Sequence, residues 1–199
     1  MMGNWTENIL DRDILQDNLT FVSLFIAVYE YTTSYVVDNI RSLLCDICIE
    51  DGKEKWIETE IYKSEIQNRI VDKLGNKDKT KASFIWLVDN DAISQDDYNV
   101  FLESKMVRNK FAHELTATIF QGIEDQHIML LINLCEMLKR ISQWFFIEVE
   151  LPIMGDELLN DGKHEDIESA GSVIFQVIMD VLYNGKSEQY QEIIARRFR

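Results

Sequence analysis

The chain has 199 residues, a formal net charge of −15 and 46% hydrophobic residues, so it can form one domain with a sizeable buried core. The negative charge repels phosphate backbones at long range, which excludes a role in coating nucleic acid but not a local binding site. One proline and eight glycines are too few for the frequent turns of a β-sandwich or barrel. The composition therefore predicts an all-α fold.

Apolar residues recur at helical spacing along most of the chain, after a polar lead-in over residues 1–17. The helices that this spacing predicts span residues 18–48, 56–74, 82–88, 94–120, 125–149, 166–184 and 187–197. Ser94, followed three residues later by Asp97, is typical of a capping box and marks the start of the fourth helix. Either Glu124 or Asp125 begins the fifth.

The first predicted helix contains the most apolar stretch of the chain. Residues 21–37 carry a single charge, Glu30, but the stretch is slightly short for a membrane span and is flanked by acidic rather than basic residues. We therefore expect a buried core helix and no membrane association.

The single proline, two glycines and several acids make residues 150–164 the best candidate for a linker. Residues 1–149 are then expected to form a helical bundle. Residues 165–199 are expected to form a helical extension that packs on the same domain.

The cysteines favour a reducing compartment. There are three, and no secretory leader precedes them, so we expect no disulfide framework and a cytoplasmic location. Cys45 and Cys48 form a Cys-x-x-Cys pair on the first predicted helix, which leaves a zinc site open. A closed zinc site needs four ligands and Cys135 is distant in sequence, so buried free thiols are favoured and no metal or other cofactor is expected.

The heptapeptide 108–114 lies within the fourth predicted helix. It contains an arginine, an asparagine and one of the three histidines of the chain. A polar stripe at helical spacing consists of Lys105, Arg108, Asn109, Ala112, His113 and Thr116. A neighbouring apolar stripe of Val107, Phe111 and Leu115 can face the core. This pattern predicts that the arginine, asparagine and histidine are displayed rigidly at the surface.

An arginine followed by a polar residue, with a histidine five positions after the arginine, resembles the motif of the HEPN superfamily. These are small all-helical domains found in bacterial toxins, antiphage systems and RNA-processing proteins. The resemblance covers the motif and the helix order over about residues 15–148. It implies a HEPN-like up-and-down helical bundle, here with extra C-terminal helices, and an endoribonuclease of toxin or antiphage-defence type.

The resemblance also implies RNA cleavage without a metal, in which the ribose 2′-OH attacks the adjacent phosphate and leaves a 2′,3′-cyclic phosphate. His113 is then the general base or acid, and Arg108 stabilises the charge that develops on the phosphoryl oxygens. Asn109 is expected to orient the histidine or the phosphate. Lys105 and Lys110 are expected to bind RNA.

Two acids are candidates for a supporting role. Glu30 interrupts an apolar helix, and a buried carboxylate there needs a partner, for which Arg41 and Arg108 are candidates. Glu114 is either an added acid near the site or solvated surface, and surface is the favoured interpretation. The tyrosine that nucleotidylated relatives carry two residues after the histidine is replaced here by Leu115, which puts that mode of control in doubt.

Arg108 and His113 are five residues apart, or about 140° around an ideal helix, so one copy places them at opposite margins of the polar stripe. HEPN relatives pair their motif helices about a two-fold axis. The resemblance thus implies a homodimer in which the two side chains of different protomers converge on one phosphate. It also leaves room for a cognate antitoxin or an activator protein.

Other interpretations remain open. The main alternative is a catalytically inactive HEPN-like interaction or regulatory module in which the polar stripe is a dimer seam. Hydrolysis of nucleotides or phosphate monoesters with Mg²⁺ is disfavoured because the chain has no glycine-rich phosphate loop. We expect the cluster of Lys73, Lys77, Lys79 and Lys81 to be solvated surface, and we expect His127 and His164 at the surface or at helix starts.

Overall fold

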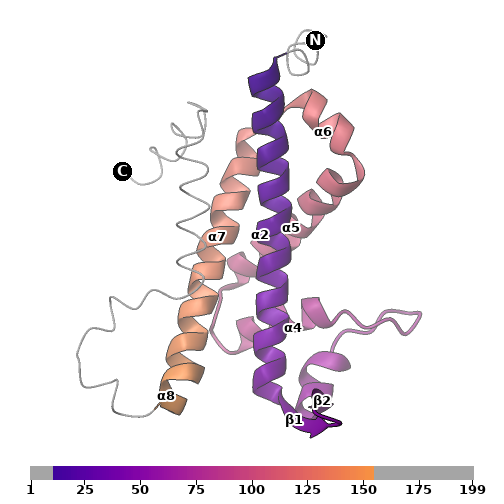
Figure 1. Cartoon of the computed structure of the whole chain (residues 1–199), viewed down its shortest axis with the longest axis vertical. Helices are drawn as coiled ribbons and strands as arrows, with labels where there is room; N and C mark the ends of the chain where they lie inside the picture. Colours follow the sequence, from indigo (N-terminus) through magenta and orange to yellow (C-terminus); the bar gives the residue numbers. More distant parts are fainter. Residues whose placement is uncertain (1–10, 155–199) are drawn as a thin grey trace, which may run out of the picture.

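The computed structural model describes residues 11–154, which are mostly helical, in agreement with the predicted all-α class. Figure 1 shows the elements in their arrangement in space. In chain order they are α2 (Arg12–Leu44), β1 (Cys45–Glu50), β2 (Lys53–Glu58), α3 (Glu60–Tyr62), the π-helical turn η1 (Lys63–Gln67), α4 (Lys79–Asp89), α5 (Gln95–His113), α6 (Leu115–Gln121), α7 (Asp125–Phe145), the π-helical turn η2 (Phe146–Glu150) and α8 (Leu151–Met154).

Helix α2 is the long helix that runs beside α7 in Figure 1. It begins at Arg12, so the last part of the expected polar lead-in is helical. The reason is the Asp11 carboxylate, which accepts hydrogen bonds from the backbone N–H groups of Asp13 and Ile14 at 2.9 and 3.2 Å and so caps the helix. Phe21, Phe25 and other apolar side chains of the stretch 21–37 are buried, which confirms a core helix. Within residues 11–154, no helix combines the length and hydrophobicity that crossing a bilayer would take.

A β-hairpin replaces the predicted end of the first helix and start of the second, and this is the main correction to the expected fold. Strands β1 and β2 pair antiparallel, and their turn is Asp51-Gly52, with φ angles of 53° and 74°. An Asp-Gly pair with positive φ at both residues is the favoured two-residue hairpin turn. The second predicted helix is therefore reduced to α3 and η1.

The Cys-x-x-Cys pair lies on strand β1 and not on a helix. Cys45 and Cys135 are buried, Cys48 is half-buried, and all three thiols are free. Burial raises the pKa of the Cys45 thiol, and it raises the pKa of Cys135 to about 12. The two buried thiols therefore stay protonated at neutral pH.

The core lies where α2, α5 and α7 pack against one another, with α4 against α2 and α5. Phe111 of α5 meets Phe21 and Phe25 of α2 edge-on, at ring-centroid distances of 6.4 and 5.3 Å. Phe84 of α4 stacks on Phe101 of α5 at 3.8 Å. Aromatic pairs of this kind add to the stabilisation that burial of their area supplies.

Several predicted boundaries are confirmed. Helix α4 covers the expected segment 82–88, Ser94 and Asp97 form the expected capping box, and Glu124 caps α7. The end of α7 is different, because helical structure continues through η2 and α8 to Met154 and Pro152 lies within α8. The rest of the expected linker, the helices expected over 166–184 and 187–197, and His164 lie outside the described residues.

Candidate functional site

The motif lies at the C-terminal end of α5. The predicted helix over 94–120 is wrong at this point, because α5 ends at His113 and Glu114 has φ −121° and ψ 32° before α6 begins. The break lets α6 return to α2, where the side-chain amide of Asn18 donates to the backbone carbonyl of Ile119 at 3.4 Å. No glycine or proline marks the break, so the chain gives no ordinary stop signal there.

Because of this break, the last residue of each predicted stripe lies on α6 and not on α5. Phe111 is fully buried and Val107 packs on the core, as expected. Leu115, however, is 41% exposed, because it belongs to α6 and does not continue the face of α5 that carries Phe111. Thr116 likewise lies on α6, so the polar stripe of α5 ends at His113.

Arg108 is held by two neighbours. Its Nε donates to Glu30 Oε1 at 2.7 Å, and its Nη2 donates to the same carboxylate oxygen. Its Nη1 donates to Asn109 Oδ1 at 3.0 Å. Of the two candidate partners, Glu30 therefore pairs with Arg108, although this carboxylate is 48% exposed and not buried.

These contacts leave part of the guanidinium free. An arginine has five N–H donors, one on Nε and two on each terminal nitrogen. Among the described residues, Glu30 takes the donor on Nε and one on Nη2, and Asn109 takes one on Nη1. One N–H remains on each terminal nitrogen, and each can donate to a phosphate oxygen.

The Glu30–Arg108 pair also affects the pKa of a neighbouring buried residue, Tyr29. Tyr29 precedes Glu30 on α2 and stacks on Phe101 of α5 at 6.2 Å. The pKa of Tyr29 is raised to about 12. Burial is the largest cause, the charge of Glu30 also raises this pKa, and the charge of Arg108 lowers it. Asp78, in the loop before α4, also raises it, so this hydroxyl stays protonated between the two acids.

The remaining predicted site residues either are exposed or form an ion pair. Lys110, His113 and Glu114 are exposed, and within the described chain the His113 imidazole has no hydrogen bond or ion pair. Lys105 Nζ lies 3.3 Å from Asp78 Oδ2. Arg108 and His113 do not contact each other: the helix rise of ~1.5 Å per residue separates their backbones by roughly 7.5 Å along the axis.

His127 lies at a helix start, one of the two expected positions, and it is buried rather than at the surface. It lies in the first turn of α7, is buried, and its Nδ1 accepts from the backbone N–H of Glu124 at 3.3 Å. Its ring packs edge-on against Phe111 at 5.3 Å. Burial lowers the pKa of His127, which keeps the imidazole neutral in agreement with its role as an acceptor.

Lysines that the sequence assigned to solvated surface, and the unpredicted Asp78, also lie near the site. Asp78 caps α4 by accepting from the backbone N–H of Lys81 at 2.8 Å, and the same carboxylate binds Lys105 of the polar stripe. Lys77 of the loop before α4 and Lys79 and Lys81 of its first turn line one hollow with Lys105 of α5. Their only sequence signal is the density of lysine over residues 73–81, which surface loops share.

Within residues 11–154, no three His, Cys, Asp or Glu side chains come together as a set of metal ligands. No protein-family model, curated protein or solved structure matches this chain. A function must therefore be inferred from the side chains of the site and their geometry.

Proposed function

We propose that this chain is a cytoplasmic, metal-independent endoribonuclease of toxin or antiphage-defence type, built on a HEPN-like up-and-down bundle. The observation that carries the proposal is the state of Arg108. Glu30 and Asn109 hold its guanidinium and leave one N–H on each terminal nitrogen, near the end of α5, where His113 is exposed. An oriented arginine of one protomer and the accessible imidazole of a second copy can together bind a phosphodiester and transfer protons during its cleavage.

In the proposed reaction the 2′-oxygen of a ribose attacks the adjacent phosphorus. A base takes the proton from the 2′-hydroxyl, a bond forms between O2′ and phosphorus, and the bond from phosphorus to O5′ breaks. The leaving O5′ takes a proton from an acid, and a 2′,3′-cyclic phosphate remains. His113 supplies one of these two proton-transfer roles, because an exposed imidazole can exchange protons at neutral pH.

Arg108 stabilises the transition state in this scheme. Negative charge grows on the non-bridging oxygens as O2′ attacks, and the two free N–H groups can donate to both oxygens at once. Glu30 acts as a positioning residue, because it fixes the guanidinium before the substrate arrives. Asn109 fixes the opposite side of the same group.

A homodimer forms part of the proposal. Arg108 and His113 lie apart on one helix, so a two-fold pairing of α5 would bring the arginine of one protomer to the histidine of the other. Met106 and Leu115 flank the motif and are 66% and 41% exposed, so each offers an apolar contact to a second copy. Control by a cognate antitoxin or activator protein belongs to the same proposal.

One observation favours the inactive interaction module instead. Three of the five donors of Arg108 are already used within the described chain, so the ion pair with Glu30 can also be read as surface structure. A shallow apolar groove on α2, lined by Leu19, Leu24 and Ala27 with Thr20 and Ser23, would then be a contact surface for a partner.

The test is incubation of the purified full chain with total tRNA and mRNA in EDTA, followed by analysis of the new ends. We expect the wild type to produce 2′,3′-cyclic phosphates and His113→Ala and Arg108→Ala to lose at least about 100-fold in rate. Arg12→Ala, which removes an exposed arginine at the start of α2, is the matched control and should keep full activity.

The outcomes separate the two functions. Full cleavage by His113→Ala would contradict the assignment of the catalytic residues. Absence of cleavage by the wild type, together with loss of self-association in the Arg108→Ala and His113→Ala variants, would support the interaction module. Growth arrest of cells that express the wild type, but not His113→Ala, would support the ribonuclease.

A further inference from the structure

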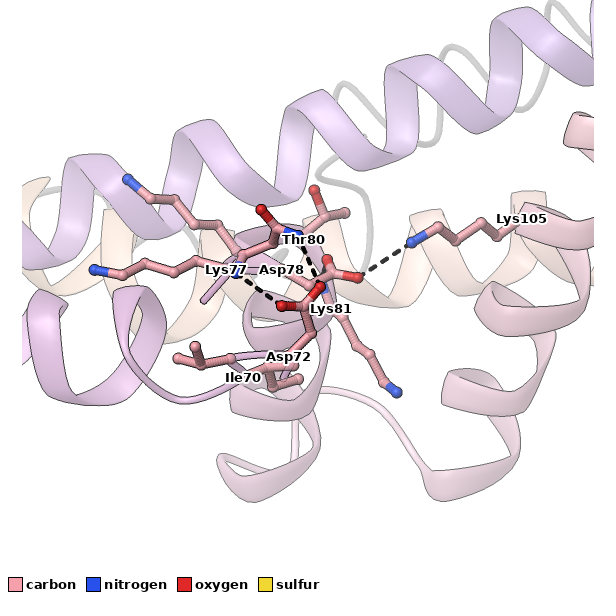
Figure 2. Close-up of a pocket in the computed structure, with 10 residues that line it drawn as sticks. Ile70, Asp72, Lys77, Asp78, Thr80, Lys81 and Lys105 are labelled. Atoms are coloured by element: carbon pink, nitrogen blue, oxygen red, sulfur yellow. Dashed lines mark hydrogen bonds and ion pairs between the residues drawn. The ribbon is translucent and has the colours of Figure 1, made fainter. Parts of the chain in front are cut away.

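An open hollow of about 690 Å³ lies between the loop before α4, the first turn of α4 and helix α5 (Figure 2). Four lysines line it, together with two aspartates: Lys77, Lys79, Lys81, Lys105, Asp72 and Asp78. Four positive and two negative groups give this lining a net charge of +2, in a chain whose net charge is −15. The hollow is therefore a local positive surface on an acidic protein.

The hollow is preformed because its loop is held by its own hydrogen bonds. The Asp72 carboxylate accepts from the backbone N–H groups of Leu74 and Asn76 and from the Asn76 side-chain amide, at 2.8 to 2.9 Å. The bonds from Asn76 lower the pKa of Asp72, so this carboxylate stays ionised and bound to the loop. The backbone N–H of Asp78 donates to the carbonyl of Ile70 at 3.1 Å and closes the loop.

Two of these four lysines form ion pairs with acidic residues, and the other two do not form one with any described residue. Lys79 Nζ lies 3.1 Å from Glu58 Oε1 and 5.5 Å from the centre of the Tyr62 ring. Lys105 Nζ lies 3.3 Å from Asp78. Lys77 and Lys81 line the hollow and form no ion pair with any described residue. Figure 2 shows the long side chains of Lys77 and Lys81 extending away from the Asp72 and Asp78 carboxylates, so their ammonium groups can take a new anion.

The hollow continues into the motif. Lys105 lines the hollow and is also the first residue of the polar stripe, one helical turn before Arg108. At ~1.5 Å per residue, the path along α5 from Lys105 to His113 covers about 12 Å, a length of a few nucleotides. An RNA strand bound in the hollow can therefore continue past Lys105 to Arg108 of the same protomer.

We propose that this lysine hollow binds the phosphate backbone of single-stranded RNA beside the phosphate that is cleaved at Arg108. The inference rests on the proposed function and adds the subsite that holds the strand. Lysines suit this task, because flexible point charges bind phosphates without reading bases. A charged groove that follows the backbone is the ordinary way to hold a single strand.

The test measures RNA binding in the His113→Ala protein, so that binding does not depend on cleavage. The probe is a fluorescein-labelled, mixed-sequence single-stranded RNA of about 12 nucleotides, chosen to exceed the ~12 Å path. Binding is followed by anisotropy over a salt series. We expect Lys77→Ala/Lys81→Ala to weaken binding about tenfold at low salt and to reduce the slope of log K against log salt by about 1.4, since each lost phosphate contact removes ~0.7.

Lys53→Ala/Lys73→Ala is the matched control. It removes two exposed lysines that do not line the hollow, and it leaves the same net charge as the test variant. Equal affinity and equal slope for the two double variants would overturn the proposal, because the effect would then be one of net charge alone. Displacement of the RNA by inorganic phosphate or AMP at concentrations comparable to the RNA would also overturn it, since the hollow would then hold a single phosphate group.

The result is separable from that for the ribonuclease. Loss of binding in Lys77→Ala/Lys81→Ala with no cleavage by the wild type would support the hollow and reject the ribonuclease. Cleavage that depends on His113 but not on Lys77 and Lys81, with unchanged RNA affinity, would reject the hollow and support the ribonuclease.

Discussion

The two sides of helix α5 differ in nearly every physical respect. One side carries Phe101 and Phe111, which are fully buried against α2, α4 and α7. The other carries Asn109 and His113, which are exposed, and Arg108 lies at the margin between the two sides, where it is half-buried and pairs with Glu30 of α2. The comparison indicates that one side of the helix supplies the folding free energy while the other is free to carry chemistry.

A second contrast follows the same division. His127 faces the buried side, where it accepts a backbone hydrogen bond and packs on Phe111. His113 faces solvent at the end of α5. A histidine that caps a helix and fills a core contact is not accessible to substrate, so of the two histidines within residues 11–154 it is His113 that suits the proposed catalysis.

The largest effect on stability is expected on the buried side. Phe111→Ala removes a fully buried ring that touches Phe21, Phe25 and His127, and it should lower the free energy of unfolding by about 3–5 kcal/mol. Urea denaturation of the full chain measures this. Glu103→Ala, at an exposed position of the same helix, is the control and should change stability by no more than ~0.5 kcal/mol. Similar losses for both variants would erase the distinction between the two sides.

On the polar side we expect a large effect on activity with little effect on stability. Arg108→Lys keeps the positive charge but loses the fork of N–H donors, so RNA cleavage should fall by about 100-fold. Single-turnover cleavage rates measure the change, and circular dichroism checks the fold. Wild-type rates in the lysine variant would mean that only the charge of Arg108 matters.

The buried histidine predicts a pH effect on stability. Burial lowers the pKa of His127 in the folded chain below its unfolded value of about 6.5. Between these two pKa values the unfolded chain binds more protons than the folded chain. The contribution of His127 to the free energy of unfolding is therefore fully present above about pH 6.5 and is lost as the pH falls through the folded pKa. Urea midpoints at about pH 7.5 and 5 should fall more in the wild type than in His127→Gln. Parallel losses in both proteins would contradict this origin.

The smallest effect is expected at the Glu30–Arg108 ion pair. Glu30 is 48% exposed and Arg108 32%, so solvent screens the pair and Glu30→Gln should change the free energy of unfolding by no more than ~1 kcal/mol. The same urea denaturation checks it. A loss above ~2 kcal/mol would show that the pair belongs to the stabilising side of the helix.

Some local features could be predicted because their causes lie within a few residues. The capping box of Ser94 and Asp97 starts α5 as its spacing indicates. The apolar stripe places Phe111 in the core. The hairpin also has a local signal, because Asp51-Gly52 lies between the first two predicted helices and an Asp-Gly pair is a favoured two-residue hairpin turn.

Other features depend on contacts between distant residues. Glu30 and Arg108 are 78 positions apart, so their pairing depends on how α2 packs on α5. The lysine hollow exists because Asp78 binds both the first turn of α4 and Lys105 of α5. Neither arrangement follows from the spacing of residues along the chain.

The sequence by itself determined the helical class, the capping box of α5, the burial of Phe111 and the candidate arginine, asparagine and histidine. These follow from local backbone preferences and from the periodicity of apolar side chains. Only the tertiary structure decided the break at Glu114, the partner of Arg108 and the position of the lysines beside the motif. The reason is that a helix break and an ion pair between helices are chosen by packing free energy, which depends on what surrounds a residue and not on its neighbours in the chain.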